Sequence, residues 1–581
     1  MLFLILVLVL SIPAVQTRLG KYATKKINEK HKTNINIQKV GLQFNGDVEL
    51  KNIYVEDYKK DTLISIVELN TSILSFKKLY DNKLTFGDID IYGMLLNIKT
   101  HQGEDQTNLD VFVAKFDSDE KSENQFLMSS SDVSFYESEF RIVDENKEEP
   151  LALALKDLNT NATGFVINGP DVMARINKMS FVDQRGLVLK NMSTNFKYTL
   201  SEMTFDFLQV KTERSELNGN LKFSYDREGL QDFVNKVKID AEFSNSTVTL
   251  EELNKFYDEF GADHTVNFNT VLYGTLNNLT ASQVELNTSG RTKIDGNLNF
   301  KNLFSKEEND FVLDADFNEL SSTYRDLSSM LPNVLGKALP STMKELGRFL
   351  IQGKSVITAR TVDVDVEINS ELGLIFTELS MSKLSHVDDA QYKGNLIMDE
   401  FNIGKLLNDP NLKTTSLNLE VDGKGFTLDR LNTFVEGKVY GLNYKDYYYS
   451  DIDVSGNVQN KIFNGKFNTK DDNIELSFNG LMDFTSEEYN YDFVADVTYA
   501  NLNALNFVKQ DSISVFRGIV DMKVKGTSID NTYGSINFKN TLYKTKTAFF
   551  RTEVLELDHK ATQSGAKSLA RSKLQTLDKQ L

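Results

Sequence analysis

The feature that most constrains this chain is a period-two alternation of apolar and polar residues, which recurs along most of its length. Residues 362–368, for example, read Val-Asp-Val-Asp-Val-Glu-Ile. Successive side chains of a β-strand point to opposite faces of the sheet, so such segments predict strands with one apolar and one solvated face. Aromatic and β-branched residues are abundant, and only 6 prolines occur. The sequence therefore predicts a mainly β fold.

Glycine recurs in the apolar phase of these strands. The pattern apolar-x-Gly-x-apolar first occurs at Phe44, Gly46 and Val48 and returns down the chain. Glycine weakens a strand by about 0.5–1 kcal/mol relative to alanine, which favours a structural reason for its recurrence. A residue without a side chain lets a sheet bend toward that face. We expect the sheet to bend at Gly46, Gly219, Gly296, Gly394, Gly480 and Gly518.

Helical periodicity interrupts the strands in short segments. Apolar spacing predicts helices over residues 108–116, 250–260 and 401–408. A longer helical stretch is divided by Pro332 and Pro340, because proline breaks a helix. The sequence therefore divides into a β segment over residues 33–327, a helical segment over 328–353 and a second β segment over 354–557. An atypical disordered or helical tail follows over residues 558–581.

The first residues are strongly hydrophobic, and Leu2–Leu10 is unbroken hydrocarbon. As a helix, ~14 residues would span about 21 Å, which is less than the ~30 Å core of a bilayer. This length is typical of a secretory signal, or of a signal-anchor whose first turns lie outside the sequence. We favour a hydrophobic signal-anchor over residues 1–15.

Residues 16–32 predict an amphipathic basic helix. One helical stripe carries the apolar residues Val15, Leu19, Tyr22, Ala23 and Ile27. Glu29 is its acid, and the basic residues are Arg18, Lys21, Lys25, Lys26, Lys30 and Lys32. This composition favours a helix that lies along an anionic membrane surface. An ordinary solvated helix is the alternative.

Composition and spacing argue against several chemistries. The net charge of −18 argues against a nucleic-acid partner, which requires cations to neutralise phosphates. The 5 histidines show no ligand spacing, and the chain contains no cysteine, so we expect no metal and no cofactor. No Gly-x-Ser-x-Gly elbow occurs. Acidic runs such as residues 363–367 are interpreted as solvated strand faces. We therefore predict no catalytic residues and no enzyme activity.

The predicted helices are too few to cover so many apolar strand faces. Either two sheets cover each other, or the apolar face lines an open groove that takes a hydrocarbon guest. In the second alternative, the groove would be lined by the in-phase apolar residues Phe44, Val48, Leu50, Leu221, Phe223, Leu298, Phe300, Ile474, Leu476 and Phe478.

The segment IPAVQTRLGKYATKKINEKHKTNINIQKVGLQFNGDVELKNIYV resembles the N-terminal region of TamB-like proteins of the AsmA-like superfamily, in the form found in Bacteroidota-type bacteria. The resemblance returns in FNIGKLLNDPNLKTTSLNLEVDGKGFTLDRL and covers roughly residues 13–557. It implies an elongated, twisted antiparallel β-groove, taco-shaped and hydrophobic inside. It also implies one N-terminal transmembrane helix in the cell inner membrane, with the body in the periplasm.

The resemblance further implies phospholipid transfer between the inner and outer membranes, with support for outer-membrane protein assembly and secretion. The implied partners are membrane phospholipids and a TamA-like Omp85-type outer-membrane barrel. The C-terminal domain of the family is not visible, and the anchor lacks a basic flank, so the chain looks truncated at both ends. A different hypothesis is a non-lipid structural scaffold, which docks an Omp85-type barrel and client β-strands by edge pairing.

Overall fold

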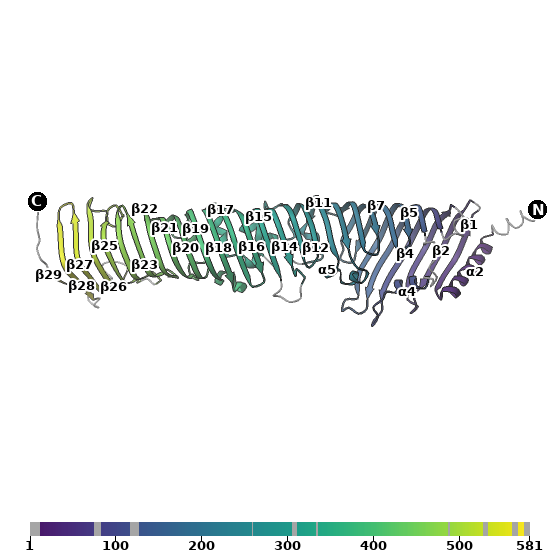
Figure 1. Ribbon diagram of the computed structural model, residues 1–581, viewed down its shortest axis with the longest axis horizontal. Helices are drawn as coiled ribbons and strands as arrows, with labels where there is room; N and C mark the ends of the chain where they lie inside the picture. Colours follow the sequence, from purple (N-terminus) through teal and green to yellow (C-terminus); the bar gives the residue numbers. More distant parts are fainter. Residues whose placement is uncertain are drawn as a thin grey trace, which may run out of the picture. The chain divides into compact units, whose positions relative to one another are not determined.

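The computed structural model describes residues 12–43, 45–74, 83–116, 127–257, 259–304, 311–332, 335–485, 488–526, 533–560 and 567–573. The chain divides into two compact units, Met1–Ser289 (unit 1) and Gly290–Leu581 (unit 2). Both are built mainly of β-strands with a few short helices (Figure 1). The predicted mainly β class is confirmed. The boundary between the units falls inside the β segment predicted over residues 33–327.

Unit 1 is an open sheet in which each strand pairs with the next along the chain. The pairs are antiparallel except β4 and β5, which run parallel. A parallel pair requires a crossover, because the chain must return to the same end of the sheet. The strands are β1 (Asn34–Leu42), β2 (Asp47–Glu56), β3 (Thr62–Ile73), β4 (Lys83–Thr100), β5 (Leu127–Asp144), β6 (Leu151–Asn168), β7 (Asp171–Asp183), β8 (Val188–Tyr198), β9 (Glu202–Lys211), β10 (Glu216–Ser224), β11 (Lys238–Thr249), β12 (Thr265–Thr275) and β13 (Leu279–Thr288).

The helices of unit 1 agree only in part with the predicted ones. The β4–β5 crossover carries α4 (Asn108–Ala114), whose N-cap Thr107 forms a capping box with Asp110. The helix predicted over 250–260 is shorter than expected, since only α6 (Leu250–Leu253) forms there. The remaining helices are α2 (Pro13–His31), η1 (Arg227–Asp232) and α5 (Phe233–Lys236).

The strands of unit 2 are antiparallel, and each pairs with the next along the chain. Its helices are α7 (Tyr324–Met330), α8 (Leu335–Ala338), η2 (Ser341–Leu346), η3 (Leu384–Asp389) and α9 (Ile403–Leu407). Its strands are β14 (Lys293–Lys301), β15 (Val312–Thr323), β16 (Arg348–Thr358), β17 (Thr361–Ser370), β18 (Gly373–Ser382), β19 (Gln391–Asn402), β20 (Leu412–Lys424), β21 (Asn432–Tyr444), β22 (Tyr447–Gln459), β23 (Ile462–Asp471), β24 (Ile474–Asp483), β25 (Asn490–Asn501), β26 (Ser514–Lys525), β27 (Tyr533–Thr545), β28 (Phe549–Lys560) and β29 (Lys567–Lys573).

Two boundary predictions for unit 2 are wrong. The helical interruption ends at Leu346 rather than at residue 353, because Gly347 adopts a left-handed conformation (φ 67°) and β16 begins at Arg348. The predicted disordered or helical tail contains strand, since β28 continues to Lys560 and β29 pairs with it. Backbone hydrogen bonds hold an edge strand of this kind, so it requires no apolar alternation.

The predicted hydrophobic signal-anchor falls largely on residues 1–11, which lie outside the described residues. From Ile12 onward, the described part of the chain has no helix with the length and apolar character needed to cross a membrane.

Candidate functional site

A row of apolar residues crosses unit 2 from β14 to β28. Residues paired across antiparallel strands lie on the same face of the sheet, so the pairing register defines the row. Thr377 is its polar member. The row runs Gly296, Phe317, Gly353, Val366, Thr377, Leu396, Leu419, Gly437, Val454, Phe467, Phe478, Ala495, Val520, Phe538 and Leu555.

A second row, two residues further along each strand, repeats this character. It includes Leu298, Val364, Leu379, Phe493 and Leu557. We call the face that carries both rows the apolar face of unit 2. Since the rows are adjacent and cross the same strands, they form one continuous surface.

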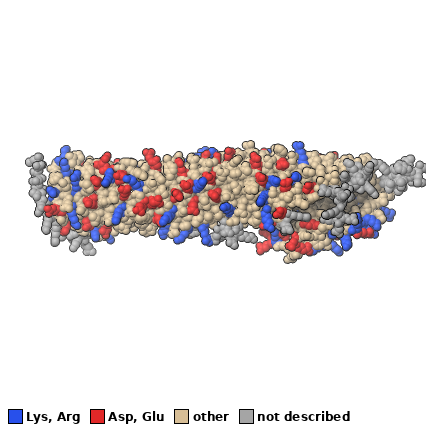
Figure 2. Space-filling model, in the orientation of Figure 1, with Lys and Arg blue, Asp and Glu red and all other residues tan. Residues whose placement is uncertain are grey.

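The opposite face of unit 2 is polar at the positions between these rows. Val494 is its apolar member. The row runs Asn297, Asp316, Lys354, Asp365, Glu378, Asn395, Glu420, Glu436, Ser455, Lys466, Asn479, Val494, Asp521, Asn537 and Glu556. Charged side chains are scattered across the surface shown in Figure 2. The sheet of unit 2 thus has one hydrocarbon face and one hydrated face.

Unit 1 has an apolar face of its own, built in the same way. One row crosses β1 to β10 through Val40, Leu50, Leu69, Ile91, Phe135, Thr160, Met179, Met192, Val210 and Leu217. Another crosses β8 to β13 through Phe196, Phe205, Leu221, Ala241, Leu272 and Ala281.

The structure places the predicted groove residues on these faces. In unit 1, four of them pair with apolar residues of a neighbouring strand: Val48, Leu50, Leu221 and Phe223. The corresponding members in unit 2 are Leu298, Phe300, Ile474, Leu476 and Phe478. Phe44 lies outside the described residues.

The apolar face of unit 2 is not equally accessible along its length. Phe478 is only 5% exposed, and its ring lies 4.6 Å from Phe467 and 4.9 Å from Phe493 between centroids. Leu505, which follows β25, is 1% exposed in the same cluster. Leu298 and Leu379, by contrast, are half-buried. The face is therefore tightly packed around β24 and β25 and more accessible at β14 and β18.

Backbone geometry requires glycine at several positions of this face, among them Gly394 and Gly480. Gly394 (φ +149°) and Gly480 (φ +146°) adopt conformations that residues with side chains rarely adopt. A Cβ on Gly394 would lie 2.0 Å from the carbonyl oxygen of Glu378, and one on Gly480 would lie 2.4 Å from that of Asp492. Glycine thus allows close approach of the neighbouring strand.

The other predicted glycines fall into two groups. Register shifts occur beside Gly219, Gly296 and Gly518, and such bulges bend a strand locally. Gly46 differs from the expectation: it lies before β2 begins, and its N–H donates to the carbonyl of Gln43 at 3.1 Å. Gly46 therefore closes the turn between β1 and β2 rather than belonging to a strand face.

The β1 edge of unit 1 is covered by polar side chains of α2. Gln16 accepts from the N–H of Leu42 at 2.9 Å and donates to its carbonyl. Thr17 bonds both backbone groups of Val40 at 3.3 Å. Asn28 donates to the carbonyl of Ile35 at 2.8 Å and accepts from its N–H at 2.9 Å. These side chains therefore satisfy backbone groups that an added strand would otherwise pair.

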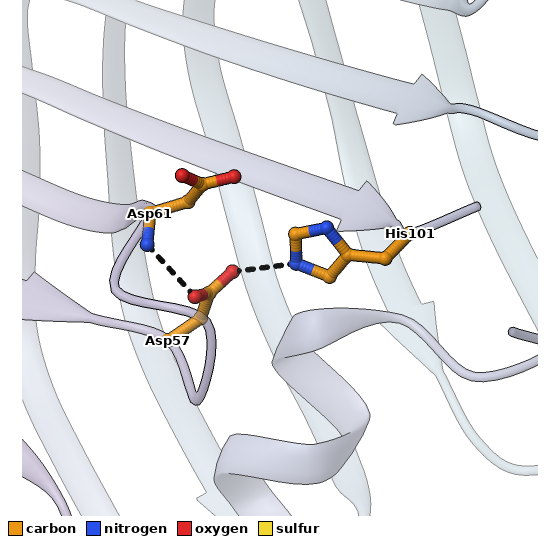
Figure 3. A group of neighbouring side chains, drawn as sticks. All are labelled: Asp57, Asp61 and His101. Carbon is orange, nitrogen blue, oxygen red and sulfur yellow. Dashed lines mark hydrogen bonds and ion pairs between the residues drawn. The ribbon is translucent and has the colours of Figure 1, made fainter.

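The charge cluster Asp57, Asp61 and His101 lies in unit 1, where the turn after β2 meets the end of β4 (Figure 3). One carboxylate oxygen of Asp57 accepts from the N–H groups of Lys59 at 2.8 Å and Asp61 at 2.9 Å. The other accepts from His101 Nε2 at 3.0 Å and Asn108 Nδ2 at 3.1 Å. Sequence spacing did not reveal this cluster, because tertiary folding brings its members together.

The hydrogen bonds of Asp57 make the cluster a structural clamp rather than a cation site. Burial alone would raise the pKa of Asp57, but the bonds from His101 and Asn108 and the turn amides hold the pKa below its usual value. Donors occupy both of its oxygens, and Lys99 Nζ lies 2.8 Å from Asp61. A cation would have to displace these donors.

Comparison of the chain with protein-family models, with curated proteins and with solved structures finds no match. The resemblance to TamB-like proteins therefore stays a prediction.

Proposed function

We propose that this chain is a TamB-like protein that carries phospholipid along its apolar faces between the inner and outer membranes. In this proposal a hydrophobic N-terminal helix anchors the chain in the inner membrane, and the β units lie in the periplasm as a groove. The chain supports outer-membrane protein assembly and secretion, with a TamA-like Omp85-type barrel as partner.

The observation that supports this proposal best is the apolar row that crosses β14 to β28, with a polar row on the opposite face. A continuous apolar surface of this extent normally marks a binding surface. Each buried methylene of an acyl chain contributes ~0.8 kcal/mol. Leu298 and Leu379 are both half-buried on this face, so a lipid can move between such positions without a large change in free energy.

Photo-crosslinking tests this proposal on the full chain. A photoreactive residue replaces Leu298, which is half-buried on the apolar face, or its neighbour Asn297 on the polar face. We expect crosslinks to phospholipid from position 298 and not from position 297, as identified by mass spectrometry. Equal lipid crosslinking at both positions, or crosslinks from 298 to protein alone, would reject lipid carriage.

A further inference from the structure

The orientation of helix α2 is unusual for an amphipathic helix. Its polar residues Thr17, Thr24 and Asn28 face the protein, where Thr24 is buried and the other two bond to β1. Gly20 lies on the same side, since a Cβ there would meet Val40 Cγ2 at 2.4 Å. A helix that packs on a soluble protein usually buries its apolar stripe instead.

The apolar stripe of α2 consequently faces outward. Leu19 is 51% exposed, Tyr22 63% and Ile27 42%. Several side-chain hydrogen bonds join the opposite side of the helix to β1, so this orientation is fixed within unit 1. An outward apolar stripe of this kind favours contact with a hydrocarbon phase.

Basic residues lie within this stripe and along one side of it. Lys25 Nζ lies 3.9 Å and Lys26 Nζ lies 3.6 Å from a carboxylate oxygen of Glu29, the acidic residue of the helix. The side chain of Lys25 is 74% exposed and that of Lys26 is 62% exposed. Lys26 Nζ also lies 5.8 Å from the ring of Tyr22. Arg18, Lys21 and Lys30 are exposed on the same helix. This basic surface contrasts with the net charge of −18 of the whole chain.

From this geometry we infer that the outward side of α2 docks on the surface of an anionic phospholipid bilayer. Leu19 and Tyr22 enter the boundary between headgroups and acyl chains, while the lysine stems extend so that their ammonium groups reach lipid phosphates. Charge complementarity selects an anionic bilayer, because an apolar protein partner would not need the basic border. This inference adds a second membrane contact to the proposed anchor and does not require lipid on the apolar faces.

The test uses the absence of cysteine in the chain, which makes a single introduced thiol a unique labelling position. An Ala23→Cys variant carries an environment-sensitive fluorophore on the outward stripe, and Ala359→Cys in unit 2 is the matched control, since both alanines are exposed. The full-length variants are bound to vesicles that contain phosphatidylglycerol and brominated lipid. We expect quenching of the label at position 23 and none at 359.

Charge and apolar variants separate docking by α2 from anchoring by the preceding hydrophobic segment. Neutralising Arg18, Lys26 and Lys30 to glutamine should lower the ratio of docked to undocked helix about five-fold for each residue. Replacing Leu19 and Tyr22 by serine should also abolish quenching. Two control variants change exposed residues of unit 2 in the same way and should leave quenching at position 23 intact. One replaces Lys354, Lys424 and Lys466 by glutamine, and the other replaces Phe434 and Tyr440 by serine.

Circular dichroism of each variant checks that the fold is retained. Quenching at position 23 that is independent of lipid charge and of these substitutions would overturn the inference, as would a chain that does not bind the vesicles. Loss of lipid carriage with normal quenching at position 23 would instead reject the proposed function alone.

Discussion

At the scale of single residues, backbone conformation decides which glycines the sheet requires. Gly480 has a positive φ and lies against the backbone of β25, whereas a Cβ on Gly41 of β1 would meet Glu49 at an ordinary 3.5 Å. Both glycines occur in alternating strand sequences, and pattern alone does not separate them. The difference arises from the distance to the neighbouring strand, which is a tertiary property.

This difference predicts opposite effects of alanine. Gly480→Ala should lower the free energy of unfolding by about 1–3 kcal/mol, because it imposes strain and a backbone collision. Gly41→Ala should raise it by about 0.4–1 kcal/mol, since the side chain fits and the unfolded chain loses freedom. Urea unfolding followed by circular dichroism measures both. Equal effects of the two substitutions would contradict the geometric explanation.

At the scale of elements, α2 shows how a helix can end a sheet. Its residues Gln16, Thr17 and Asn28 bond the N–H and C=O groups of β1 that face away from β2. Exposed edges of this kind otherwise invite pairing with another chain. A scaffold that pairs by its edges could therefore not use the β1 edge in this state, because side chains of α2 already bond its backbone groups.

Removal of these polar groups should expose the edge. The triple variant Gln16→Leu, Thr17→Val and Asn28→Leu keeps side-chain size but leaves the β1 backbone groups without partners, so we expect concentration-dependent self-association in sedimentation velocity. The control changes Gln352→Leu and Asn479→Leu affect strands whose backbones pair on both sides. A monomeric triple variant would show that the edge is protected by other means.

At the scale of the whole molecule, the register across strands matters more than any single residue. Gly296 and Phe478 belong to one apolar row, although one lies on β14 and the other on β24. Carriage depends on the accessible positions of such a row, because each of them must accept hydrocarbon. One charged side chain in an accessible part of the row should interrupt it.

Leu379→Asp provides this interruption. A charge surrounded by hydrocarbon costs about 2.5–3.5 kcal/mol, which corresponds to slowing on the order of a hundred-fold at that point. Leu379 is half-buried and therefore tolerates the change better than Phe478, whose ring is packed. The adjacent Ser380→Asp points to the polar face and is the matched control. Vesicle-to-vesicle lipid transfer measures both, and equal transfer rates would argue against movement along this face.

The sequence by itself determined the two-faced strands, because alternation is a local property of each segment. Residues 362–368 predict β17, and the spacing of residues 108–116 predicts α4. The in-phase apolar residues Leu298 and Leu476 could likewise be assigned to an apolar face, since pairing conserves the side of the sheet.

Only the tertiary structure decided how these elements meet. Turns and bulges set the register that aligns the rows, and these depend on contacts between strands. Hydrogen bonds to β1 hold the apolar stripe of α2 outward. The helical periodicity of the sequence predicts the stripe but not the direction in which it faces. The bond between Asp57 and His101 joins residues from different strand ends. Local patterns specify the faces of each element, whereas the partner of each face is a property of the folded chain.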